Sequence, residues 1–106
     1  MVTDALTLLK EARVILTTMG WAQDAPQGEP WVQAEDAPVC LGFAIARAYW
    51  MHDRARDWIE WSDTPGLLSA LKFNGSGECF RWNDTPGRTK AEVFARLDVA
   101  IASLEN

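Results

Sequence analysis

The run of residues 39–51 constrains the fold most, because it is apolar or small at every position except Arg47. It is too short to cross a bilayer, which takes about 20 apolar residues. A helix that is apolar on almost all sides is normally buried. Just before it, Asp36-Ala37-Pro38 offers an N-cap and a proline for the first turn. The sequence therefore predicts a buried central helix around which the other segments pack.

Amphipathic helices are predicted at both ends of the chain. Residues 4–19 carry apolar side chains at helical spacing, after a possible cap at Thr3-Asp4 and before Gly20. Residues 90–104 form the other amphipathic helix. Thr89 lies just before this helix and Glu92 lies in its first turn. Their spacing is that of a capping box, in which each side chain accepts a hydrogen bond from the backbone N–H of the other residue. We expect both helices to cover the central one.

The remaining segments are less regular. Prolines and glycines predict a loop over residues 20–38, with a short strand at 31–33, and residues 65–73 read as a short helix. Residues 54–61 are interpreted as helical, either continuing the central helix or starting a new one. Residues 78–82 alternate polar and apolar side chains, which fits a short strand or an extended approach to the next turn.

The predicted fold is mainly α, a small bundle of four or five helices around the buried central helix. At most it adds a two-stranded element from residues near 31 and 79. A chain of 106 residues is the size of one domain, so residues 1–106 are taken as a single domain.

One six-residue stretch occurs twice. Residues 61–66 read Trp-Ser-Asp-Thr-Pro-Gly, and residues 82–87 differ from them only in having Asn83 where the first copy has Ser62. Two copies are too few for a solenoid, which needs at least three stacked units. Asp, Thr, Pro and Gly are turn residues. We interpret the copies as two similar turns, each followed by a helix.

Charge and composition exclude several classes of function. The formal net charge of −5, without a local Lys/Arg cluster, disfavours a nucleic-acid partner, which is held by neutralising phosphates. Two distant cysteines and one histidine do not make a metal site, and no cofactor motif is present. No signal peptide or membrane-spanning run is recognised, so we expect a cytoplasmic protein with reduced cysteines and no membrane partner.

Cys40 is the sharpest candidate for chemistry. A thiol in the first turn of a helix lies near unpaired N–H groups, which stabilise a thiolate. A nucleophile also needs a base, and the single histidine, His52, would lie roughly 18 Å further along a continuous helix. The alternative is a small buried side chain. The six tryptophans, Trp82 among them, either fill the core or line a recognition surface.

Three blocks taken together point to a family. They are Gly20-Trp21-Ala22-Gln23, then Val39-Cys40-Leu41-Gly42-Phe43-Ala44, then Trp82-Asn83-Asp84-Thr85-Pro86-Gly87-Arg88-Thr89 with Glu92-Val93. Their order and spacing resemble a functionally uncharacterised family of small proteins from actinobacteria and their phages. Phe43 departs from the small residue usual there. The resemblance implies an architecture rather than a reaction, and makes Trp21, Gln23, Cys40, Asn83 and Asp84 a candidate constellation. It also suggests that the turn at 82–87 is held against the start of the central helix.

Two functions from different classes remain open. The first is a non-enzymatic binding or accessory protein, phage-encoded, that engages a host protein or a small ligand. Its candidate binding residues are Trp21, Gln23, Cys40, Trp82, Asn83 and Asp84. The alternative is a small cysteine-dependent enzyme with Cys40 as nucleophile and Asp84 or Asn83 as orienting groups. A structural or regulatory oligomer is a third reading.

Overall fold

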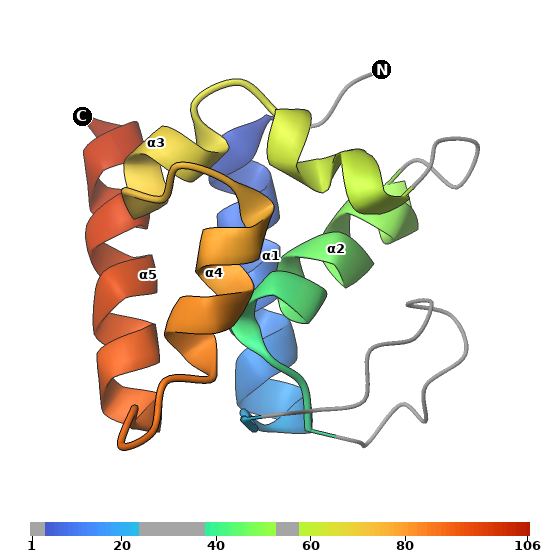
Figure 1. Cartoon of the computed structure of the whole chain (residues 1–106). Helices are drawn as coiled ribbons and strands as arrows, with labels where there is room; N and C mark the ends of the chain where they lie inside the picture. The colour runs from blue at the N-terminus through green and yellow to red at the C-terminus, as the bar shows by residue number, and fades with distance from the viewer. Residues whose placement is uncertain (1–3, 24–37, 53–57) are drawn as a thin grey trace.

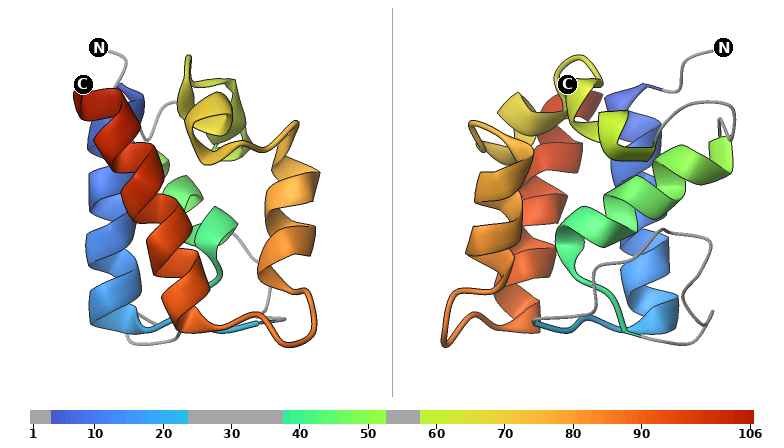
Figure 2. Two further views of the ribbon diagram at one scale, coloured as in Figure 1. Left: turned by 90° about the vertical axis from the view of Figure 1, so that its left-hand side faces the viewer. Right: turned by 45° about the vertical axis from the view of Figure 1, so that its right-hand side comes forward.

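The computed structural model describes residues 4–23, 38–52 and 58–106, and most of these residues are helical. Their elements are α1 (Ala5–Met19), α2 (Leu41–His52), the 3₁₀ helix η1 (Trp58–Asp63), α3 (Leu67–Leu71), α4 (Ser76–Asn83) and α5 (Lys90–Glu105). Helices α1 and α5 lie side by side. Helix α4 lies on the opposite side of the start of α2 (Figures 1 and 2). The predicted mainly α class is confirmed.

Helix α1 forms as the sequence predicts. The Asp4 side chain caps it by accepting a hydrogen bond of 2.8 Å from the Thr7 N–H. Gly20 ends it with a φ of 93°, a conformation that glycine adopts without steric cost, and its N–H donates to the carbonyl of Leu16. The apolar face is buried, and Leu8 has no exposed surface.

Helix α2 is the buried centre of the fold, also as predicted. Its buried residues are Leu41, Gly42, Phe43, Ala44, Ile45, Ala46, Ala48 and Tyr49. The helix begins at Leu41, later than the predicted start at 39, because the carbonyl of Cys40 accepts the first intrahelical bond, from the Ala44 N–H at 3.0 Å. Cys40 is therefore the N-cap residue and does not lie within the first turn. Of the predicted cap, residues 36 and 37 lie outside the described part of the chain.

A glycine lets α2 and α4 approach closely. A Cβ atom on Gly42 would lie only 2.6 Å from a ring carbon of Phe80 on α4. The Phe80 ring also meets the buried Trp61 edge-on, with ring centroids 6.2 Å apart. An aromatic ring of α4 therefore lies directly against the backbone of α2 at Gly42.

The strand predicted near residue 79 is wrong, because residues 78–82 belong to α4. Cys79 and Asn83, four residues apart on a helix, both point into the core and are fully buried. The second strand of the predicted pair, near residue 31, lies outside the described residues. The described chain instead has one isolated parallel bridge between Trp21 and Val39, which holds together the two ends of the predicted 20–38 loop.

The region between α2 and α3 is partly described. Residues 53–57 lie outside the described part, so whether the central helix continues there is not tested. Residues 58–63 form the 3₁₀ helix η1, within the segment predicted to be helical. Helix α3 spans Leu67–Leu71, shorter at both ends than the predicted helix over 65–73.

The repeated stretch makes the same turn twice. In each copy the threonine N–H donates to the tryptophan carbonyl, and the residue after glycine donates to the threonine carbonyl. The four bonds are Thr64 to Trp61, Leu67 to Thr64, Thr85 to Trp82 and Arg88 to Thr85. Gly66 and Gly87 have φ values of 81° and 86°. A type II turn requires such a positive φ after proline. The interpretation as two similar turns, each leading into a helix, is confirmed.

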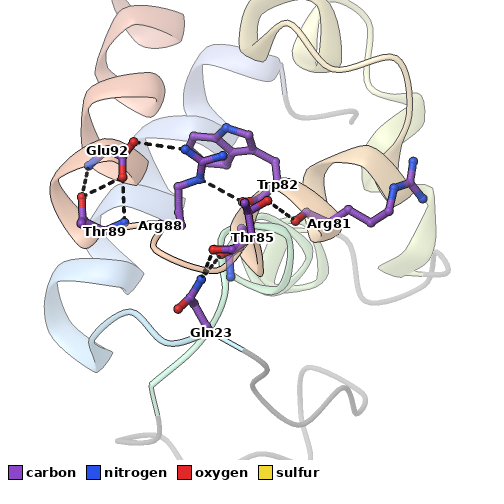
Figure 3. Close-up of polar contacts among 8 residues, drawn as sticks. Gln23, Arg81, Trp82, Thr85, Arg88, Thr89 and Glu92 are labelled. Carbon is purple, nitrogen blue, oxygen red and sulfur yellow. Dashed lines mark hydrogen bonds and ion pairs between the residues drawn. The ribbon is translucent and has the colours of Figure 1, made fainter.

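Helix α5 begins with the predicted capping box. Thr89 Oγ1 accepts from the Glu92 N–H at 3.2 Å, and a Glu92 carboxylate oxygen accepts from the Thr89 N–H at 3.0 Å (Figure 3). Val93 and Leu97 of α5 are fully buried. None of the helices in the described ranges is long and apolar enough to cross a membrane.

Candidate functional site

The side-chain amide of Asn83 lies at the centre of a buried hydrogen-bond network. Its oxygen accepts from the Trp21 indole N–H at 2.6 Å and from the Leu41 backbone N–H at 3.0 Å. Its nitrogen donates to the Ala22 carbonyl at 3.2 Å and to the Asp84 carboxylate at 2.9 Å. A carboxamide offers two acceptor and two donor positions, so every one is used. The turn at 82–87 is thus held against the start of α2, as predicted.

Gln23 extends this network to the backbone of the turn at 82–87. Its side-chain nitrogen donates to the Asn83 carbonyl at 3.2 Å and to the Thr85 carbonyl at 2.6 Å (Figure 3). The Thr85 hydroxyl donates in turn to the carbonyl of Arg81 at 2.9 Å. The last carbonyls of a helix have no partner within it, so these bonds satisfy the end of α4.

Cys40 caps α2 with its sulfur. The Sγ atom accepts from the Phe43 N–H at 3.3 Å, and the residue is only 3% exposed. Burial raises the pKa of the Cys40 thiol to about 11, and the charge of Asp84 raises it as well, while N–H groups at the helix start act in the opposite direction. Cys79 is also a buried free thiol whose pKa is raised, mainly by burial. Both thiols are therefore protonated near neutral pH.

His52 is far from Cys40, as the sequence indicated. The two residues lie at opposite ends of α2, a helix of 12 residues and so about 18 Å long. The imidazole Nε2 of His52 lies 2.5 Å from a carboxylate oxygen of Glu11 on α1. Among the described residues, no three His, Cys, Asp or Glu side chains are grouped to hold a metal ion.

Trp82 contacts two arginines. The guanidinium carbon of Arg88 is 4.2 Å from one of its ring centroids and that of Arg96 is 4.7 Å away. Arg88 also donates to the Trp82 carbonyl at 3.0 Å and pairs with Glu92 at 3.1 Å (Figure 3). Arg96 stacks on the Phe73 ring at 4.0 Å. The indole of Trp82 therefore contacts cations of its own chain.

A family model described as a family of unknown function, DUF6197, matches residues 1–103. The chain belongs to this family. The match confirms the resemblance to an uncharacterised family. The three blocks as a pattern of that family, and an origin in actinobacteria and their phages, stay predictions. No curated protein and no solved structure matches the chain. Membership of DUF6197 therefore supplies no activity, and the function must be argued from the geometry.

The structure of this DUF6197 protein brings most of the predicted constellation together. Trp21, Gln23, Asn83 and Asp84 share one network, and Cys40 precedes Leu41, the residue that Asn83 bonds. Trp82 stands apart from them, because it contacts Arg88, which precedes α5, and Arg96 within α5. A role of these residues in binding a ligand stays a prediction.

Sequence reasoning missed two surface depressions. One lies between α1 and α2, has a volume of about 290 Å³ and is lined by Glu11, Val14, Ile15, Met51 and His52. The other lies between α3 and α5, has a volume of about 350 Å³ and is lined by Ala70, Leu71, Lys72, Ala95, Arg96 and Val99. We call them the α1–α2 groove and the α3–α5 groove. Neither is lined by a predicted site residue, and no motif marks either one, because their residues come from helices distant in sequence.

Proposed function

We propose that this protein is a non-enzymatic, cytosolic binding protein that engages a partner protein through the α1–α2 groove. The observation that carries the proposal is the exposure of two large apolar side chains on that groove, Val14 at 63% and Met51 at 54%. Single exposed apolar residues are common on any protein, whereas clustered ones mark interaction sites. These two come from different helices and line the same groove.

The groove has the layout of a small protein interface. Ile15 adds a partly buried apolar surface beside Val14, and the paired Glu11 and His52 supply polar groups. An apolar centre with polar groups at the rim is typical of protein interfaces, in which a few anchoring side chains carry most of the affinity. The groove is large enough for one or two apolar side chains of a partner helix or loop.

The Asn83 network supports this surface in our proposal and does not line it. It fixes the first turn of α2, and the last turn of the same helix carries Met51 and His52. A ligand at Asn83 would have to displace a hydrogen bond that the side chain already makes. Trp21, Gln23, Cys40, Asn83 and Asp84 are therefore proposed to position the binding surface.

A cysteine-dependent enzyme is the second candidate, and two observations weigh against it. Burial raises the pKa of Cys40 to about 11, although the thiolate is the reactive form of cysteine. His52, paired with Glu11, is at the opposite end of α2. Alkylation of the folded protein across pH tests this reading. An apparent Cys40 pKa well below the free value of about 8.5 would favour the enzyme.

Affinity capture with matched variants tests the binding function. The tagged protein, a Val14→Lys/Met51→Lys double variant and a Val99→Lys variant are each incubated with host lysate, and the captured proteins are quantified by mass spectrometry. All three positions are exposed helix positions and lysine is a good helix former, so each variant should fold, which thermal unfolding verifies. Val99 is the matched control, since it lies on the α3–α5 groove.

We expect a partner that the wild type and Val99→Lys both capture and that the double variant loses. A site-specific photo-crosslinker at Val14 should then join that same partner to the protein. If all three proteins capture the same set in the same amounts, the α1–α2 groove is not the binding surface. Equal loss in Val99→Lys would show that capture depends on surface hydrophobicity in general.

A further inference from the structure

The α3–α5 groove combines an apolar surface with positive charge. Ala70, Leu71, Ala95 and Val99 line it with apolar groups, and Val99 is 59% exposed. Its volume of about 350 Å³ is within the range of small-molecule sites, roughly 300–1,000 Å³. Lys72 and Arg96 supply the only ionisable side chains of this lining.

Neither cation makes an ion pair with a carboxylate in the described part of the chain, although the charge of Glu78 also acts on Arg96. Lys72 is exposed and takes part in no ion pair there. Arg96 donates to the carbonyls of Leu71 at 2.8 Å and Lys72 at 2.9 Å, and stacks on Phe73 and Trp82. These contacts orient the guanidinium without cancelling its charge, and they leave N–H groups free for an acceptor, because a guanidinium carries five.

We propose that the α3–α5 groove binds an amphiphile that carries a carboxylate, with a medium-chain fatty acid anion as the simplest example. The alkyl chain lies along Val99 and Ala95, and the carboxylate pairs with the ammonium of Lys72 beside Arg96. A charge-assisted hydrogen bond of this kind is among the stronger polar contacts available to a small ligand. The apolar part supplies affinity and the cations select the charge of the head group.

The α1–α2 groove provides an internal comparison. It is also apolar and of similar size, but its polar groups are a carboxylate and an imidazole that pair with each other, Glu11 and His52, in place of two cations without an ion pair. The whole protein is acidic, with a net charge of −5, so an anion gains nothing from the overall field. Selective binding of an anion at the α3–α5 groove would therefore reflect Lys72 and Arg96. This inference does not depend on the proposed partner-binding function, which uses the other groove.

Titration of the ¹⁵N-labelled protein with decanoate, below its micelle concentration, tests the inference. We expect amide shifts at Lys72, Ala95 and Val99, and none of comparable size at Val14 and Met51. Decanol has the same chain without the charge and should bind more weakly, by up to about fivefold, which is the contribution of a partly exposed ion pair. Decyltrimethylammonium should not shift the α3–α5 residues.

Two variants of Lys72 isolate its charge. Lys72→Glu should weaken decanoate binding by at least about fivefold, and Lys72→Arg should retain it. Position 72 has a φ of 64°, a left-handed conformation that strains lysine, glutamate and arginine alike. Unfolding curves verify that both variants fold. Absence of binding to the wild type, equal shifts at both grooves, or unchanged affinity in Lys72→Glu would each overturn the inference. None of these results decides whether the α1–α2 groove binds a partner protein.

Discussion

Asn83, the last residue of α4, hydrogen-bonds to Leu41, the first residue of α2, with 3.0 Å between its side-chain oxygen and the backbone nitrogen. The first N–H groups of a helix have no partner within it and are usually satisfied by a neighbouring side chain. Here a residue 42 positions further along the chain satisfies the first of them, and the Cys40 sulfur satisfies the third. The start of the central helix therefore depends on the end of α4.

Replacing Asn83 should destabilise the fold strongly. Asn83→Ala leaves the Trp21 indole N–H, the Leu41 N–H and the Ala22 carbonyl without their partner. Each buried unpaired group costs about 1–3 kcal/mol, so we expect a loss of about 3–5 kcal/mol in the free energy of unfolding, measured with guanidinium. Ser62→Ala, at the equivalent position of the first turn, is the control and should change it by less than about 0.5 kcal/mol. Similar effects of both substitutions would contradict the role of Asn83.

Gly42 should tolerate no side chain. In an ordinary helix Gly→Ala stabilises by up to about 1 kcal/mol, but here the new Cβ would lie 2.6 Å from the Phe80 ring. We expect Gly42→Ala to destabilise by about 1–3 kcal/mol. A Phe80→Leu substitution in the same protein should recover part of that loss, which a double-mutant cycle measures.

Gly77→Ala provides the matched control for Gly42. Gly77 also lies within a helix, but its Cβ would meet only the flexible end of Arg81. This substitution should therefore be neutral or stabilise by up to about 1 kcal/mol. If Gly42→Ala were equally harmless, the close approach of α2 to α4 would be wrong.

Stability should fall in alkaline solution because of the two buried thiols. Burial raises the pKa of Cys40 from the free value of about 8.5 to about 11, and that of Cys79 is raised as well. The unfolded chain thus releases these protons at a lower pH than the folded protein. The free energy of unfolding is unaffected well below pH 9 and falls between about pH 9 and 11, by up to about 1.4 kcal/mol per pH unit for each thiol.

Unfolding with guanidinium at pH 7.5, 9.0 and 10.5, in the presence of a reductant, measures this dependence. Lysines and tyrosine also titrate at high pH, so the comparison is with a Cys40→Ala/Cys79→Ala variant, which keeps those groups. We expect a steeper fall for the wild type. Parallel curves for the two proteins would mean that the thiols do not contribute.

The two turns also predict opposite effects of removing a hydroxyl. Thr64 is 6% exposed, and its hydroxyl oxygen has no hydrogen-bond partner in the described part of the chain. Thr64→Val keeps the shape and should leave the stability unchanged or raise it by about 1 kcal/mol. Thr85→Val removes the bond to the Arg81 carbonyl and should cost about 0.5 kcal/mol. Thermal unfolding of the two variants side by side is the measurement, and a destabilised Thr64→Val protein would refute the first expectation.

The sequence predicted those parts of the fold that depend on near neighbours. Asp4 and the Thr89–Glu92 pair act within a few residues, so α1 and α5 could be located together with their ends. The two turns were equally local. Helix α4 was misread because its side chains meet different neighbours on different sides. Phe80 packs against α2, whereas Trp82 contacts Arg88 and Arg96. The sequence of α4 therefore lacks the single apolar stripe by which a short helix is recognised.

The candidate site was predictable only in outline. The repeated stretch indicated only a turn at Asn83, but in the structure its side chain reaches Trp21 and Leu41, which are 62 and 42 positions away. The resemblance grouped the right residues without indicating which atoms meet. Long-range bonds of this kind depend on how helices pack, and neither spacing nor composition carries that information. The two grooves escaped notice for the same reason.

The bonds from Arg96 to the end of α3 have a consequence for motion. Helix α3 has five residues and is too short to persist by itself. Its final carbonyls are held by a guanidinium that belongs to α5. Any fluctuation that frays the middle of α5 should therefore release α3 with it, so the amides of both helices should exchange with solvent as one cooperative unit. A ligand in the groove between them would slow that exchange for both helices together.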